Sequence, residues 1–114
     1  MPFRPSPSED LLLEEFRRRL LLAAPGQVAA LRVFGSRARG TSNERSDLDV
    51  AVEPGPGAER QRLQRAAIGA AWEAMEALRL EELMLAPVVV PMDGRGLAAV
   101  IVREGALIWR DGAA

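Results

Sequence analysis

The segment that decides the fold runs from Gly35 to Asp49 and reads GSRARGTSNERSDLD. An apolar pair, Val33-Phe34, precedes it, and the apolar stretch Val50 to Val52 follows it. This order predicts a strand, a glycine turn, a short helix, a polar loop and a second strand. Because residues two apart on a strand point to the same face, we expect Asp47 and Asp49 to project together, while their apolar neighbours point into a core.

The two ends of this segment carry complementary chemistry. Adjacent carboxylates repel each other, and a cation such as Mg²⁺ commonly relieves that repulsion. Gly35 allows a close approach of the backbone, and Ser36 is predicted to cap the short helix and to hold an anion such as a phosphate. A phosphate cradle facing two carboxylates suits metal-assisted phosphoryl or nucleotidyl transfer. The competing interpretation is a surface turn in which Asp47 and Asp49 are ordinary loop residues. It explains less of the pattern, because the two acids lead directly into a strand.

The spacing of these residues resembles the signature of the DNA polymerase β-like nucleotidyltransferase superfamily, in which a Gly-Ser pair, a connection of similar length and Asp-x-Asp follow one another. The segment is most similar to the minimal nucleotidyltransferases, which are small single-domain proteins. Several of these act as the antitoxin of a two-gene pair whose toxin has a helical HEPN domain. The motif covers residues 35–49, and the predicted order of elements agrees with the family over most of the chain.

The resemblance implies a nucleotidyltransferase that depends on Mg²⁺ or Mn²⁺, with Asp47 and Asp49 as its catalytic metal ligands. The implied reaction transfers AMP from ATP to a hydroxyl and releases pyrophosphate. The acceptor would be a HEPN-type toxin partner or a small molecule. The residues that the resemblance assigns to nucleotide binding are Gly35, Ser36, Arg37 and Ser46. Arg37 and Arg39 flank the cradle, where contact with a triphosphate competes with surface exposure or pairing with Glu44.

The superfamily also uses a third carboxylate on a later strand, where it helps to bind the metal that activates the acceptor hydroxyl. The strand expected at 83–90 contains no acid, and Ala86 or a neighbour stands where an aspartate is expected. Glu81, Glu82 and Asp93 lie at the ends of this strand and are poor geometric substitutes. The alternative is therefore a catalytically weak or inactive nucleotide-binding, antitoxin-like protein that binds a HEPN-domain partner. A purely structural domain, indifferent to Mg·ATP, is the third hypothesis.

Composition limits the other possibilities. The 114 residues suggest one domain over 1–114, with a loose start at 1–5. The chain has no cysteine or histidine, and all fifteen of its basic residues are arginine, which excludes disulfides, imidazole catalysis and lysine chemistry. The net charge of −1 gives no basic field for nucleic acid. With no membrane-spanning run and no signal-peptide pattern, we expect a cytoplasmic protein.

The remaining patterns complete an α/β (α+β) fold, in which a small mixed β-sheet is backed by helices. Ser6, Pro7 and Glu9 predict a capped helix start. The predicted helices cover 7 to 23 or 24, 36–39, 58 to 80 or 82, and 97–103, and the strands 28–34, 47 or 48 to 52, 83–90 and 106–109. Pro87 indicates an edge strand or a bulge.

Two further features have more than one interpretation. The run Arg17-Arg18-Arg19 is predicted to be a solvated helix face paired with Glu14 and Glu15, rather than a phosphate-binding patch. Trp72 is predicted to fill the core or a partner interface, rather than to stack on an adenine. The small core and the apolar helices favour a homo- or hetero-oligomer.

Overall fold

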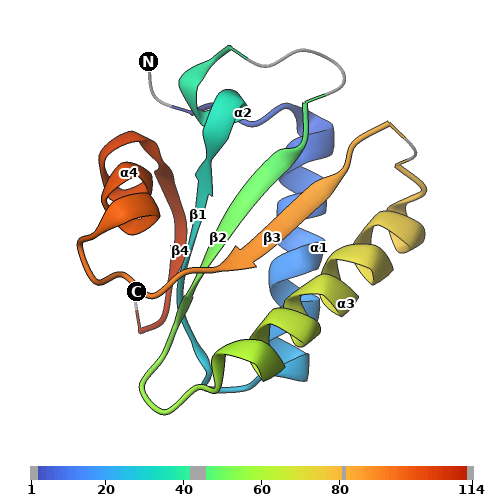
Figure 1. Ribbon diagram of the computed structural model, residues 1–114. Coiled ribbons are helices and arrows are strands. Elements are labelled where there is room, and N and C mark those ends of the chain that lie inside the picture. The colour runs from blue at the N-terminus through green and yellow to red at the C-terminus, as the bar shows by residue number, and fades with distance from the viewer. Residues whose placement is uncertain (1–2, 42–45, 81, 113–114) are drawn as a thin grey trace.

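The computed structural model describes residues 3–41, 46–80 and 82–112, which form four helices and four strands (Figure 1). In chain order these elements are α1 (Pro7–Ala23), β1 (Val28–Phe34), α2 (Gly35–Arg39), β2 (Leu48–Pro54), α3 (Arg60–Leu78), β3 (Leu85–Val89), α4 (Gly96–Glu104) and β4 (Ala106–Arg110). The sheet order is β3-β2-β1-β4, with β3 parallel to β2 and the other pairs antiparallel. The predicted element order and mixed sheet are confirmed.

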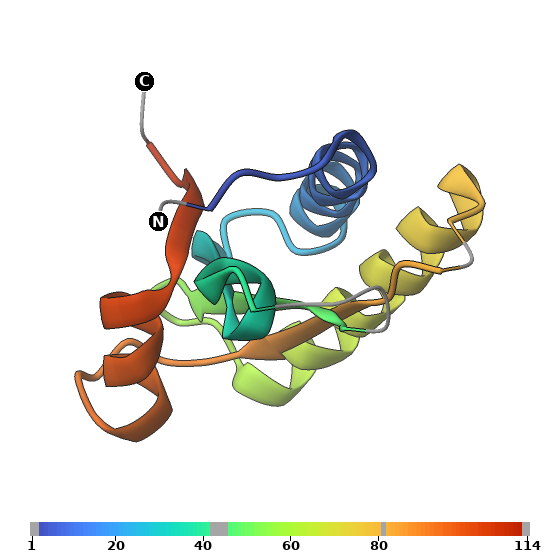
Figure 2. The ribbon, with the colours of Figure 1, turned by 90° about the horizontal axis from the view of Figure 1, so that it is seen from above.

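The two faces of the sheet are covered unequally. Helices α1 and α3 pack together on one face and bury the larger core, which includes Leu12, Phe16, Leu20, Leu31, Val33, Leu48, Val50, Val52, Leu63 and Ala67. Helix α4 covers part of the other face with a small cluster of Ala51, Val90, Ala98 and Ile101. Figure 2 shows α4 and α3 on opposite sides of the molecule. Among the described helices, none is long and apolar enough to cross a membrane.

The first helix follows its sequence closely. The Ser6 hydroxyl accepts a hydrogen bond from the Glu9 N–H at 3.2 Å, and the Glu9 carboxylate accepts one from the Ser6 N–H at 2.8 Å, so the predicted capping box is confirmed. The three consecutive arginines pair with Glu14 and Glu15 along the helix surface. This confirms the prediction of a solvated, ion-paired face.

Three local predictions need correction. Helix α2 begins at Gly35, and Phe34 takes the N-cap position, so Ser36 lies inside the helix and does not cap it. Helix α3 is shorter than predicted at both ends, because the Glu59 side chain caps its start and Arg79 adopts a left-handed φ of 53° at its end. Trp72 was predicted to fill the core or a partner interface; it does not fill the core, because 58% of its surface is exposed, and the interface stays a prediction.

The outer edge of β3 is closed by a side chain from α3. Pro87 has no N–H to offer, and its carbonyl accepts a hydrogen bond from the Gln64 amide at 3.0 Å. The Gln64 carbonyl in turn accepts from the Val89 N–H at 2.7 Å. The prediction of an edge strand at Pro87 is confirmed, and Gln64 occupies backbone groups that could otherwise pair with another chain.

Gln64→Ala should therefore lower the free energy of unfolding by about 1–2 kcal/mol, because it leaves two backbone groups at the β3 edge unpaired. Urea denaturation measures this loss. Gln61→Ala is the matched control, because Gln61 lies exposed one turn earlier on the same helix. Equal stability of the two variants would contradict the role assigned to Gln64.

Candidate functional site

The two aspartates lie at the start of β2, on the thinly covered face of the sheet. Asp49 stands opposite Phe34 of β1 and beside Ala86 of β3. Phe34 packs against the small cluster under α4, and directly paired residues share a face, so Asp49 projects to the same side. Asp47 precedes the strand by one residue and is exposed, whereas Asp49 is partly buried. The structure thus places the predicted carboxylates together on the open face, away from the α1–α3 core.

The turn at Gly35 brings bare backbone against the Asp49 carboxylate. Gly35 has a φ of +76°, and a Cβ atom built on it would lie 2.4 Å from Asp49 Oδ2. No side chain other than hydrogen fits between this turn and the carboxylate. The first turn of α2 therefore starts directly beside the acid pair, as the motif predicts, and Ser36 follows at the next position.

The electrostatics of the pair favour a cation. Burial raises the pKa of the Asp49 carboxyl above its usual range, and the negative charge of Asp47 raises it further. The guanidinium of Arg39 lowers the pKa and partly offsets these effects. A carboxylate held beside another negative charge, with part of its hydration removed, is stabilised when a divalent cation binds both acids.

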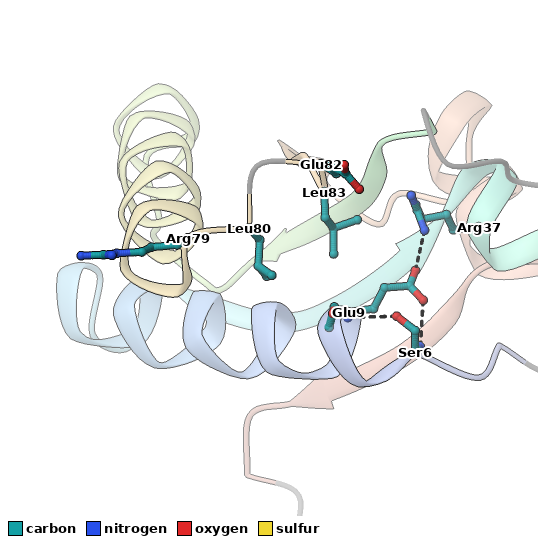
Figure 3. A pocket seen from close by; sticks show the side chains of 8 residues that line it. Ser6, Glu9, Arg37, Arg79, Leu80, Glu82 and Leu83 are labelled. Atoms are coloured by element: carbon teal, nitrogen blue, oxygen red, sulfur yellow. Dashed lines mark hydrogen bonds and ion pairs between the residues drawn. The ribbon is translucent and has the colours of Figure 1, made fainter.

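Arg37 is occupied by protein atoms. Its guanidinium donates to Glu9 Oε2 at 3.1 Å and, through Nε and Nη2, to the Ser46 carbonyl at 2.9 and 2.6 Å. Figure 3 shows Arg37 and Glu9 facing each other, with Ser6 on the other side of the carboxylate. Arg37 therefore joins α1, α2 and the residue that precedes Asp47. The predicted alternative of pairing with Glu44, and residues 42–45 of the predicted polar loop, lie outside the described residues.

Arg37→Ala should lower the free energy of unfolding by about 2 kcal/mol, because the Glu9 carboxylate would lose its ion-pair partner in a largely buried setting. Thermal denaturation followed by circular dichroism measures the change. Arg39→Ala is the control and should cost less than about 0.5 kcal/mol, because Arg39 is 48% exposed and lies 3.9 Å from Glu104. If Arg37→Ala lowered the free energy of unfolding no more than Arg39→Ala does, the stabilising role of the Glu9–Arg37 ion pair would be ruled out.

A hollow of about 480 Å³ lies beside the Glu9–Arg37 ion pair (Figure 3). Its walls come from the start of α1, from Arg37, and from the end of α3 with the segment that leads to β3. The lining residues are Ser6, Ser8, Glu9, Arg37, Arg79, Leu80, Glu82 and Leu83. They include neither Asp47 nor Asp49, so we assign this hollow no part in the chemistry at the aspartates.

The position beside Asp49 on β3 carries no acid. The parallel register pairs Asp49 with Ala86, and Val88 lies two residues further along β3. Within the part of the chain that the structure describes, no three acidic side chains gather into a metal-binding group. From the described residues the site therefore offers two carboxylates, which leave room for further oxygen ligands such as water or a substrate.

Sequence reasoning gave too little weight to two residues of this region. For Arg39 the predicted alternatives were contact with a triphosphate, surface exposure or pairing with Glu44, and none of them included the interaction of its exposed guanidinium with Asp49. Glu9 was predicted only as a capping residue, and its ion pair with Arg37 spans 28 positions of the chain. The helical position of Arg39 could have indicated its direction, but no local pattern indicates the Glu9–Arg37 pair.

Comparison with known proteins gives a consistent result. The profile of the nucleotidyltransferase domain family matches residues 10–88, well over half of the chain. No curated protein matches the sequence. Several solved structures resemble the chain at 19–22% sequence identity, so their likeness shows the fold alone.

Three crystal structures share the fold. A toxin–antitoxin structure with AMP-PNP has a TM-score of 0.56 at 22% identity, covering 87% of this chain and 74% of that one. A toxin–antitoxin MntA-HpeT variant with two aspartates changed to glutamate has a TM-score of 0.57 at 19% identity, covering 84% and 72%. An MntA-HpeT variant with a tyrosine changed to alanine has a TM-score of 0.53 at 22% identity, covering 87% and 73%.

Proposed function

Because the chain belongs to the nucleotidyltransferase domain family, we propose that it transfers a nucleotidyl group, with ATP as the donor and a hydroxyl as the acceptor. The observation that carries this proposal is the pair Asp47 and Asp49, which lies on the open face of the sheet directly beside the bare backbone of Gly35. The likeness to a structure that contains AMP-PNP supports an adenine nucleotide as the ligand.

The two aspartates have the chemistry to hold Mg²⁺ or Mn²⁺. Both are carboxylates on one face, and the raised pKa of Asp49 indicates that a nearby positive charge would stabilise its ionised form. A bound Mg²⁺ would supply positive charge to neutralise the triphosphate and to polarise the α-phosphate. Cytoplasm supplies both Mg²⁺ and ATP, and we expect the protein to act there.

The other residues of the site would bind and position the nucleotide. We assign the N–H groups at the start of α2 and the Ser36 hydroxyl to the terminal phosphates, as the family motif implies. Arg39 is exposed beside Asp49 and suits a phosphate oxygen. For Arg37 and Ser46 we propose a positioning role, because the Arg37 guanidinium fixes the Ser46 carbonyl next to Asp47. An acceptor hydroxyl would then attack the α-phosphorus and lose its proton to water, while the bond from the α-phosphorus to the oxygen shared with the β-phosphate breaks and pyrophosphate leaves.

A second candidate function is that of an antitoxin, which neutralises a toxin partner either with the help of a bound nucleotide or by binding alone. Ala86 beside Asp49 removes the acid that the superfamily uses to activate the acceptor, which favours a slow or inactive enzyme. The similar structures are toxin–antitoxin structures, and this supports an antitoxin role with a HEPN-domain partner. The two candidates coexist if the partner is also the acceptor.

Labelling with α-³²P-ATP tests the proposal. The protein, Mg²⁺ and a purified HEPN-domain protein are incubated with the labelled ATP, and transfer is followed as label on protein together with released pyrophosphate. Transfer that disappears in the Asp47→Asn/Asp49→Asn variant supports the enzyme. A stable complex without transfer, equally strong in that variant, would leave the second candidate and contradict the first.

Ala86→Asp should raise the transfer rate roughly tenfold if the missing acid limits catalysis, because the new carboxylate would project beside Asp49 on the same face. The initial rate of pyrophosphate release at saturating Mg·ATP measures this gain. Ala86→Asn is the matched control, since asparagine has nearly the same size and shape as aspartate at this position beside Asp49 but carries no charge. An unchanged rate in Ala86→Asp would show that this position is not what limits the reaction.

A further inference from the structure

The outer face of α3 carries features that the folding of this chain does not require. Residues 62, 65, 69, 72 and 76 follow one another at helical spacing, and they form the stripe opposite the buried residues of α3. We name this stripe, Arg62, Arg65, Gly69, Trp72 and Glu76, the outer stripe. Figures 1 and 2 show α3 along the outside of the molecule.

The middle of the outer stripe is open and apolar. Trp72 is 58% exposed, and Ile68 and Met84 beside it are also exposed. A Cβ atom built on Gly69 would meet nothing within 4 Å, so packing within this chain does not demand a glycine. A glycine inside a helix costs stability relative to alanine. A close approach by a second backbone explains both the small residue and the exposed indole next to it.

The charges of the outer stripe are ordered along the helix in the unfavourable direction. Arg62 and Arg65 lie in the first half of α3, whereas Glu76 of the stripe, and Glu73 beside the stripe, lie in the second half. A helix dipole favours acids near the start and bases near the end. Among the described residues, Arg62, Arg65 and Glu76 form no ion pair, and Glu73 contacts only Arg19, at 3.3 Å. Glu59 at the N-cap offsets part of this order, because its charge interacts with Arg65 and Arg62. Within the described residues, Glu76 at the other end of the stripe has no ion-pair partner.

The order of charges along α3 is complementary to that of a second α3 that runs antiparallel to it. Gly69 lies midway between Arg65 and Glu73, and also midway between Arg62 and Glu76. A two-fold axis at Gly69 would place each basic residue of one copy opposite an acidic residue of the other. We propose that the outer stripe is a self-association surface, on which α3 of a second copy of this chain packs antiparallel and crosses at Gly69.

The surface on either side of Gly69 fits this arrangement. A hollow of about 440 Å³ adjoins Trp72 and is lined by Met75, Glu76, Arg79, Leu80 and Met84. Another of about 500 Å³ lies at the start of α3 and is lined by Arg60, Gln61, Gln64 and Arg65. The two-fold axis brings the first hollow of one copy over the second of the other. The Trp72 indole then lies over an arginine of the second copy, a favourable cation–π contact.

Sedimentation equilibrium of the full chain, from about 5 μM to 1 mM, tests the proposal. A single helix pair buries less than a standard interface, so we expect a dimer with a Kd on the order of 10–100 μM. Arg62→Glu and Glu76→Arg should each weaken the dimer by at least about tenfold, because each creates two like-charge contacts across the axis. Mixing these two variants should restore dimerisation, because every contact is then between opposite charges.

Further variants test whether the outer stripe, rather than another surface of the protein, mediates dimerisation. Arg110→Glu, on β4, should leave the Kd unchanged. Each variant should bind Mg·ATP like the wild type, because α3 and the aspartates lie on opposite faces of the sheet. Gly69→Ala should raise the melting temperature of dilute protein by about 3 °C and still weaken the dimer. A wild type that stays monomeric at 1 mM, or a dimer indifferent to these charge reversals, would overturn the proposal and leave the stripe to a different protein.

Discussion

Replacing Asp49 with asparagine is expected to abolish the binding of Mg·ATP and, in the same molecule, to raise the melting temperature of the metal-free protein. The carboxylate is partly buried and lies near the negative charge of Asp47, so its ionised form is unfavourable when no cation is present. Asparagine removes that charge at nearly constant volume. We expect a rise of about 1–3 °C, together with a loss of affinity greater than about a hundredfold.

The pH dependence of stability gives a second test of the same residue. The native protein holds the Asp49 proton to a higher pH than the unfolded chain, in which the pKa lies near 3.8. As the pH rises from that value through the raised native pKa, the native state binds more protons than the unfolded state, so the free energy of unfolding falls. Asp49→Asn should remove this decrease, and saturating Mg²⁺ should reduce it in the wild type.

Differential scanning calorimetry between about pH 4 and pH 8 measures the stability effect, and titration calorimetry with Mg·ATP measures the binding. Asp111→Asn is the control, because Asp111 is exposed in the turn after β4 and lies far along the chain from the site. A melting temperature that falls in Asp49→Asn, or binding that persists, would contradict the metal-site assignment. Asp47→Asn should weaken binding similarly, with a smaller rise in stability, because Asp47 is exposed.

Local sequence patterns were sufficient for the elements that carry the site. The capping box at Ser6 and Glu9 depends on residues three apart, and α1 begins where it predicts. Strand β1 has the predicted bounds, since its apolar residues end at a glycine. The Asp-x-Asp spacing predicted two acids on one side of the chain with an inward-pointing residue between them. Leu48 is fully buried, Asp49 lies on β2, and Asp47 comes one residue before the strand. These features are governed by near neighbours, so the sequence specifies them directly.

Contacts between distant segments could not be read in this way. The ion pair between Glu9 and Arg37 joins two helices, and neither residue has a neighbour in sequence that indicates the other. For Trp72 the sequence left the core and a partner interface open, and only the packing of α3 excludes the core, which is filled there by alanines and by α1. Position 86 was identified by comparison with the family motif, and only the β2–β3 register shows that it adjoins Asp49.

Gly35→Ala is expected to lose roughly a hundredfold in affinity for Mg·ATP, although it adds only one methyl group. The new Cβ atom would lie 2.4 Å from Asp49 Oδ2, closer than any non-bonded contact permits. The end of a carboxylate side chain can rotate, so we expect Asp49 to turn away from its present position rather than the strand to move. A misplacement of about 1 Å can cost a catalytic site about a hundredfold in rate. We expect a loss of similar size in affinity, because Asp49 would no longer be placed to hold the metal.

Gly40→Ala separates this effect from backbone strain. Gly40 ends α2 with a φ of +77°, almost the same as the +76° of Gly35, and a Cβ atom there would meet nothing within 4 Å. Both substitutions should therefore lower the free energy of unfolding by about 1–2 kcal/mol. Only Gly35→Ala should also lose nucleotide affinity, as measured by titration calorimetry. Equal affinity in the two variants would show that the close approach of Gly35 to Asp49 serves the turn and not the site.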